Sequence, residues 1–184
     1  MSSNMIFDLL QQMLEGANKT NSRSKPHITV LMDYENIHIS LQKRNWNGDQ
    51  KELIQGMKRK LQKDGEMVHI EAYADWKKLA NGSSKETDWQ RNLAELGVKT
   101  HYLVSINGKN SVDMKVADDI RDLIERSPWD PEGTDIIVIA THDSDFRWVA
   151  ETAVKRGRQL RLVGLRGAFS NQLMNIVGKK NVHY

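Results

Sequence analysis

Aspartates stand beside the strongly apolar segments of the chain. Asp33 ends the run HITVLMD, and Asp143 and Asp145 come shortly after the run TDIIVIAT. Asp113 opens an amphipathic stretch that follows a third strand-like segment and a loop. Carboxylates gathered at one place repel one another unless a cation or protons neutralise them. If the fold brings these four together, they can hold a divalent metal ion.

Each aspartate taken alone also has a structural interpretation. Aspartate is among the favoured residues at helix N-caps, so Asp33, Asp143 or Asp145 can cap the element that follows it. For a single aspartate, capping is the better interpretation; the combination favours a metal site. Hard oxygen ligands without any cysteine select Mg²⁺ or Mn²⁺, which are the cofactors we expect.

The elements that must position these residues alternate between strands and helices. Apolar, β-rich segments predict strands at 27–33, 66–74, 98–104, 134–141 and 159–165, and helical patterns predict helices at about 50–63, 86–96, 112–123, 146–155 and 170–177. This alternation predicts an α/β fold with a central, mostly parallel sheet and helices on both faces. Ligands of such sheets bind at the carboxyl ends of the strands, where the acidic residues fall.

The first residues of the chain are distinct from this alternation. Residues 1–16 predict an amphipathic helix, because Ile6, Leu9, Leu10 and Met13 recur at helical spacing. Residues 17–26 are polar and predict a linker, and residues 27–184 form the domain. We expect the helix to pack on the domain or across a subunit contact, where it would support a homo-oligomer.

Composition and missing motifs exclude several classes of protein. The 184 residues contain no cysteine, which excludes disulfides and thiolate zinc sites. The sequence also lacks a P-loop, a G-x-G-x-x-G turn and a G-x-S-x-G elbow. No apolar run reaches membrane-span length and no signal peptide is evident, so we expect a cytoplasmic protein without a membrane partner.

Four short motifs follow one another along the domain. LMDYENI places Asn36 three residues after Asp33, and YADW ends the second predicted strand. GKNSVDMKVADDI contains Asp113 and Asp119, and THDSDF contains Asp143 and Asp145. In this order the motifs resemble the NYN domain family, a branch of the PIN-like nucleases that includes the LabA-like bacterial proteins. The resemblance spans roughly residues 27–177.

The resemblance implies a three-layer α/β/α sandwich, acidic metal ligands and RNA cleavage that leaves a 5′-phosphate. The family's site residues carry over to Asp33, Asn36, Asp113, Asp119, Asp143 and Asp145. We expect Asp33, Asp113, Asp143 and Asp145 to be the catalytic metal ligands. Asp119 ranks below them, since six residues of helix are about 600° of rotation and place it on another face from Asp113.

Other residues are candidates for contacts with RNA. Asn36 can orient a ligand or phosphate, Lys109 lies on a glycine-containing loop close to Asp113, and Ser144 and Ser170 can donate to phosphate. His142 either touches substrate or metal, or packs within the fold. The cationic segments around Lys58–Lys63 and Lys155–Arg166, the second including Arg156 and Arg158, fit a polyanionic partner or plain solvated surfaces.

Two functions remain open at this point. The first is a metal-dependent ribonuclease that hydrolyses RNA phosphodiester bonds. The alternative is a non-catalytic module with the same fold that binds RNA or a protein partner. The full set of acidic residues favours the enzyme.

Overall fold

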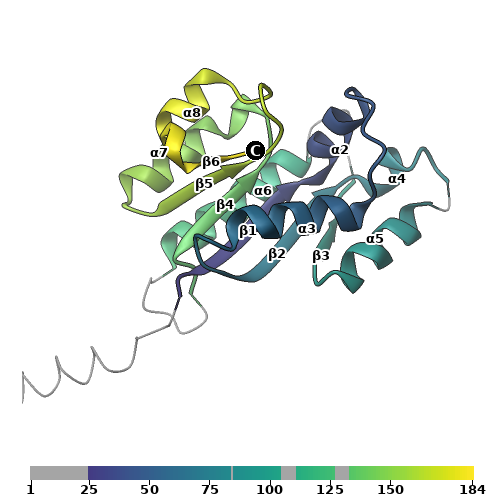
Figure 1. Ribbon diagram of the computed structural model, residues 1–184, viewed down its shortest axis with the longest axis horizontal. Helices are drawn as coiled ribbons and strands as arrows, with labels where there is room; N and C mark the ends of the chain where they lie inside the picture. Colours follow the sequence, from purple (N-terminus) through teal and green to yellow (C-terminus); the bar gives the residue numbers. More distant parts are fainter. Residues whose placement is uncertain (1–24, 84, 105–110, 127–132) are drawn as a thin grey trace, which may run out of the picture.

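The computed structural model describes residues 25–83, 85–104, 111–126 and 133–184, and its centre is one parallel sheet (Figure 1). In these residues the sheet has six strands in the order β3-β2-β1-β4-β5-β6, and every neighbouring pair is parallel. The strands are β1 (His27–Asp33), β2 (Glu66–Ala74), β3 (Lys99–Tyr102), β4 (Ile136–Ala140), β5 (Gln159–Val163) and β6 (Val182–His183). The α/β prediction is confirmed.

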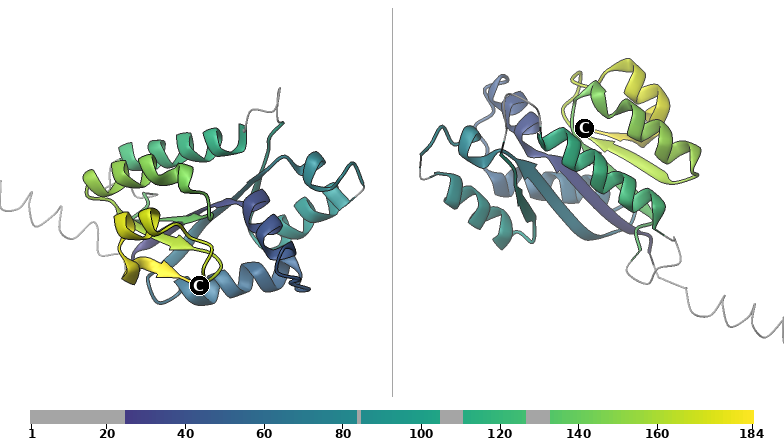
Figure 2. Two further views of the ribbon diagram at one scale, coloured as in Figure 1. Left: turned by 90° about the horizontal axis from the view of Figure 1, so that it is seen from above. Right: turned by 180° about the vertical axis from the view of Figure 1, so that it is seen from behind.

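Helices cover both faces of the sheet and make the molecule a three-layer sandwich. One face carries α2 (Tyr34–Gln42), α3 (Gln50–Leu61), α4 (Trp76–Leu79) and α5 (Lys85–Glu95). The other face carries α6 (Ser111–Glu125), α7 (Arg147–Lys155) and α8 (Asn171–Val177). Figure 1 looks onto the face with α3, and the right view of Figure 2 shows α6 crossing the opposite face.

Two hydrophobic cores separate these layers. In β1, Val30 and Met32 belong to the core beneath α2 and α3, whereas Leu31 belongs to the core beneath α6. This division follows from the strand period of two, which points successive side chains to opposite faces. Asp33 therefore points to the same face as Leu31, toward α6.

Several elements differ from the sequence expectation, among them α2, α4 and β6. We expected the first helix of the domain to begin near residue 50, but α2 begins directly after Asp33. Its buried residues are only Tyr34, Ile37 and Leu41, and the polar residues between them hide the helical period. The short β6 was also missed, because a strand of two residues has no periodic pattern.

The strand order creates a switch point beside β1. The chain moves outward from β1 to β3, then returns through α6 to β4 on the other side of β1. Crevices beyond the carboxyl ends of strands at such switch points are where open α/β sheets bind ligands. Asp33 ends β1 there, and Thr141 follows β4 there, since Met32 and Ala140 are register partners.

Some sequence predictions fall outside the described residues. The N-terminal helix, the linker except for Lys25 and Pro26, and Lys109 are among them, and they stay predictions. Across the described parts of the chain, no helix is both long and apolar enough to cross a membrane.

Candidate functional site

Asp33 is a buried carboxylate at the switch point. Its side chain is the N-cap of α2: Oδ1 accepts a hydrogen bond from the Asn36 backbone N–H at 3.1 Å. Oδ2 accepts from the Thr141 hydroxyl at 3.2 Å. Only 3% of Asp33 is exposed. The capping interpretation is therefore right in geometry, yet capping alone does not require a buried carboxylate.

The surroundings of Asp33 disfavour its negative charge. Burial raises the pKa of the carboxyl to about 7, and the nearby charges of Asp113 and then Glu35 push it in the same direction. The bonds from Asn36 and Thr141 oppose this shift only in part. A cation between Asp33 and Asp113 would stabilise both ionised forms. Because each Asp33 oxygen accepts one hydrogen bond here, lone pairs remain for such an ion.

Thr141 links Asp33 to the loop after β4. Its oxygen donates to Asp33 and accepts from the Asp143 backbone N–H at 3.2 Å. Asp143 in turn caps the 3-10 turn η1 (Ser144–Phe146), with Oδ1 accepting from the Asp145 N–H at 2.8 Å. Asp143 is half-buried, whereas Ser144 and Asp145 are exposed. The loop thus brings the Asp143 backbone to the Asp33 site and leaves Asp145 at its solvent side.

Asn36 and His142 hold this loop against α2 and β5. The Asn36 side-chain oxygen accepts from the His142 backbone N–H at 3.0 Å. The His142 Nε2 accepts from the Leu165 backbone N–H at 2.8 Å, so Nδ1 carries the proton and donates to Ser40 Oγ at 3.1 Å. Burial, and next the charge of Arg44, lower the pKa of His142 to about 4.

These contacts give His142 the packing role rather than a contact with metal or substrate. Both of its ring nitrogens bond to protein groups, and its ring meets the edge of Phe169 at a centroid distance of 5.4 Å. A Cβ at position 164 would lie 2.5 Å from His142 Nε2, so glycine is needed for this close approach.

The remaining predicted residues lie in different surroundings. Asp113 is half-buried in the first turn of α6 and acts on Asp33 through its charge. Ser170 caps α8 by accepting from the Leu173 N–H at 3.2 Å. Arg158 donates to the carbonyl of Thr134, which precedes β4, at 2.6 Å. That bond places Arg158 at the amino-terminal edge of the sheet, opposite to the Asp33 site.

A second polar group lies on the same face of the sheet, where Glu71 is two residues nearer the amino end of β2 than Tyr73, the register partner of Asp33. We call it the lower group, and Asp33 with Asp113, Asp143 and Asp145 the upper group. Ligand atoms of Glu71 on β2, His101 on β3 and Asp119 on α6 all lie within 4.8 Å of one another. Among the described residues, this trio meets that distance test, and the four predicted metal ligands do not. The Tyr73 hydroxyl lies between the two acids, 2.9 Å from Asp119 Oδ2 and 3.1 Å from Glu71 Oε2.

Lysine and histidine side chains already bond to the acids of the second group. Lys115 Nζ lies 2.5 Å from Asp119, and His101 Nε2 lies 2.5 Å from Glu71, with Lys99 at 3.5 Å. The His101 bond is the main reason why the pKa of Glu71 falls to about 2. A metal ion could use these ligands, but it would have to displace lysine and histidine contacts.

Sequence reasoning missed Glu71 and His101 in this group. The signal was present in β2, where the period of two places Glu71 on the same face as Tyr73 and beneath α6. His101 lies on a different strand from Glu71, so no local spacing in the sequence relates the two residues. Asp119 belongs to this lower group and not to the surroundings of Asp33, in line with its rotation away from Asp113.

Comparisons with known proteins agree with this architecture. A crystal structure of a protein of unknown function from Vibrio parahaemolyticus RIMD 2210633 matches with a TM-score of 0.65 at 18% identity, over 89% of this chain and 94% of that chain. At this identity the match supports the fold alone. No curated protein matches the sequence. The model of the NYN domain matches residues 27–179, which is most of the chain. The chain therefore belongs to the NYN domain family, a branch of the PIN-like nucleases.

Proposed function

We propose that this chain is a metal-dependent ribonuclease that hydrolyses RNA phosphodiester bonds with Mg²⁺ or Mn²⁺. The observation that carries the proposal is the buried Asp33 carboxylate at the sheet's switch point, with its pKa raised to about 7 beside Asp113. Perturbed carboxylates in such positions are candidates for functional sites. Membership of the NYN family supports nuclease chemistry, and RNA as the substrate is part of the proposal.

The proposed ligand set is Asp33, Asp113, Asp143 and Asp145. Asp33 supplies a rigid oxygen, because α2 and Thr141 fix both of its carboxylate atoms. Asp113 lies in the first turn of α6 and acts on Asp33 through its charge, and Asp143 and Asp145 lie in the segment after β4. A bound divalent ion lowers the pKa of a water ligand and neutralises charge on the phosphate.

Protein groups around the acids have supporting roles in this proposal. Asn36 and His142 hold the β4 loop at its distance from α2, and so position Asp143. Ser144 is exposed beside Asp143, where its hydroxyl can donate to a phosphate oxygen. Ser170 is less suited to that role, because its hydroxyl oxygen already caps α8. Lys109 remains a proposed phosphate contact.

The test compares two aspartates of the same helix. Labelled single-stranded RNA and DNA are incubated with wild type, Asp113→Asn and Asp118→Asn, in Mn²⁺, Mg²⁺ or EDTA. Asp118 is 54% exposed and pairs with Arg121, so its substitution controls for the change of charge on α6. We expect metal-dependent cleavage of RNA by wild type and by Asp118→Asn, and its loss in Asp113→Asn.

The alternative function predicts a different result from the same reactions. A binding module with a PIN-like fold would retain RNA without cleaving it in any metal. If wild-type protein leaves RNA and DNA intact under every condition, the enzyme proposal is wrong. Binding titrations with the uncleaved RNA then decide whether RNA or a protein is the partner.

A further inference from the structure

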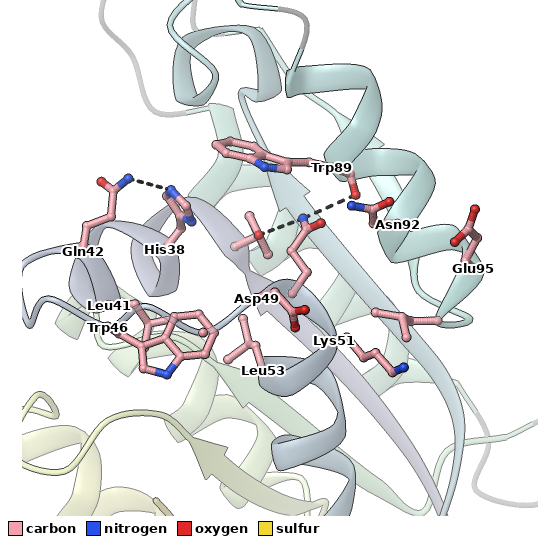
Figure 3. Close-up of a pocket in the computed structure, with 14 residues that line it drawn as sticks. His38, Leu41, Gln42, Trp46, Asp49, Lys51, Leu53, Trp89, Asn92 and Glu95 are labelled. Atoms are coloured by element: carbon pink, nitrogen blue, oxygen red, sulfur yellow. Dashed lines mark hydrogen bonds between the residues drawn. The ribbon is translucent and has the colours of Figure 1, made fainter.

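A cavity of about 630 Å³ opens on the face of the sheet opposite to α6. Its walls come from α2, the loop between α2 and α3, the first turn of α3, and α5 (Figure 3). None of the acidic residues proposed to bind metal lines it. The cavity is therefore a separate feature, and neither its position nor its lining follows from the metal site.

Aromatic rings line much of this cavity. His38 stacks on Tyr34 with centroids 5.8 Å apart and planes inclined by 19°, and it meets Trp89 at 5.0 Å. Figure 3 draws Trp89 and Trp46 on opposite sides of the cavity, with His38 between them. Trp46 is 37% exposed, which leaves part of a large ring available for contact.

The loop between α2 and α3 is built to hold the Trp46 ring. Asn45 has a positive φ of 54°, which turns the chain before Trp46. The Trp46 backbone N–H then donates to Leu41 O at 3.1 Å. A Cβ at position 48 would lie 2.1 Å from Trp46 Cζ2. Gly48 thus lets the indole lie against the backbone. The exposed ring is fixed in place and is not a loose surface side chain.

Amide groups add hydrogen-bonding capacity to the aromatic walls. Gln50 Nε2 donates to Tyr34 Oη at 2.9 Å and to Trp89 O at 3.3 Å. Its Oε1 is buried and has no hydrogen-bond partner among the described residues. Buried polar atoms without a partner are uncommon and call for an explanation. Gln42 and Asn92 also line the cavity, and Lys51 adds a positive charge beside the carboxylates of Asp49 and Glu95.

We propose that this cavity binds a nucleobase of single-stranded RNA, which stacks on Trp46 and Trp89 and is read by the side-chain amides. Unpaired bases bind proteins by stacking on aromatic side chains and by hydrogen bonds along their edges. A fixed indole, a second aromatic wall and amides supply both kinds of contact. The identity of the ligand as RNA rests on the proposed function, whereas the base-stacking cavity itself does not.

The chain connects this cavity directly to the acidic site. Tyr34 lines the cavity, and its neighbour Asp33 caps the same helix on the α6 side. Gln50, at the start of α3, bonds to Tyr34 and so closes the cavity near the carboxyl edge of the sheet. A strand of RNA that crosses this edge can therefore place a base in the cavity while a nearby phosphate reaches the solvent side of the acidic site, where Asp145 lies.

The experiment compares two ligands that differ only in a base. Binding of a labelled RNA oligonucleotide and of its counterpart with abasic positions is measured by fluorescence anisotropy in EDTA. Both ligands carry the same phosphates, so their ratio of Kd isolates the contribution of the bases. For wild type we expect a ratio of roughly 10-fold or more, in the range measured for base–aromatic stacking.

Matched variants then test which residues produce this ratio of Kd. Trp46→Leu should lower it toward one, Trp46→Phe should restore part of it, and Gly48→Ala should lower it although every ring is kept. Trp148→Leu is the control, since Trp148 is 52% exposed on α7 and does not line the cavity. Thermal melting checks that each variant is folded.

The outcomes separate this inference from the proposed function. A wild-type ratio near one, or an unchanged ratio in Trp46→Leu and Gly48→Ala, overturns the base-binding cavity even if the protein cleaves RNA. A ratio that depends on Trp46 in a protein that never cleaves RNA supports the cavity and contradicts the ribonuclease. A cavity that takes an aromatic peptide side chain instead of a base would also give a ratio near one.

Discussion

Two acidic groups lie on the same face of the sheet, beside α6, and the pKa values of one carboxyl group in each are shifted in opposite directions. Asp33, near Asp113, has its pKa raised to about 7, first by burial. Glu71, in the group with His101 and Asp119, has its pKa lowered to about 2, first by the His101 hydrogen bond. Lysine side chains pair with the acids of the lower group, whereas burial and neighbouring carboxylates raise the pKa of Asp33 in the upper group.

This difference separates acids that stabilise the fold from acids that can bind a ligand. A buried carboxylate surrounded by lysine, histidine and tyrosine helps to fix strand against helix. A buried carboxylate that faces other carboxylates destabilises the fold unless a bound cation neutralises its charge. Function is therefore expected at the upper group, although the lower one has the tighter set of candidate ligand atoms.

The largest effect is expected when the charge of Asp33 in the upper group is removed. Asp33→Asn keeps a favoured N-cap residue and should fold, but it removes a ligand charge from the upper group. Because a metal ion contributes several kcal/mol to transition-state stabilisation, cleavage should fall by roughly 10²–10³-fold. RNA affinity should hold or increase, since a negative charge facing phosphate is lost. Single-turnover cleavage and binding titrations on one RNA measure both quantities.

A change of pH should reveal the free-energy cost of ionising the buried Asp33 carboxyl. Its folded pKa lies above its unfolded value, so the folded state keeps a proton that the unfolded state releases between about pH 4 and pH 7. The free energy of unfolding should therefore fall as pH rises through this window, by up to about 4 kcal/mol for a shift from 3.8 to about 7.

The measurement is the difference between wild type and Asp33→Asn. Histidines such as His142 titrate in the same window, and they contribute equally to both proteins. Urea denaturation at several pH values should show wild type losing stability relative to Asp33→Asn as pH rises. Parallel curves for the two proteins would mean that Asp33 is ionised without penalty.

A smaller effect is expected at the lower group. Tyr73→Phe removes the hydroxyl between Glu71 and Asp119, and should lower the free energy of unfolding by about 1–3 kcal/mol. The rise in melting temperature caused by Mn²⁺ should be the same as in wild type, and it should be blunted in Asp143→Asn. If Glu71→Gln or Tyr73→Phe abolishes the response to Mn²⁺, the lower group is the metal site and the comparison is reversed.

The sequence predicts the upper group better than the lower one for a physical reason. Asp33 and Asp143 follow apolar strands, and parallel strands present their carboxyl ends at one edge, so their proximity follows from topology. Glu71 and His101 meet because β2 pairs with β3 in one register, which no local pattern specifies. The structural role of His142 is hidden in the same way, since it depends on the adjacency of β4 and β5.

The smallest expected effect concerns cations at the two edges of the sheet. Lys109 is expected near Asp113 by its motif, so Lys109→Ala should weaken RNA binding a few-fold and reduce the salt slope by about 1. Charge clustering alone makes Arg156 and Arg158 candidates for contacts with RNA. Arg158 binds carbonyls at the amino-terminal edge, and Arg156 is the C-cap residue of α7 beside it. Arg156→Ala should therefore leave the salt slope unchanged. Titrations at two salt concentrations measure this contrast, and equal losses in both variants would mean that RNA extends along the sheet to its far edge.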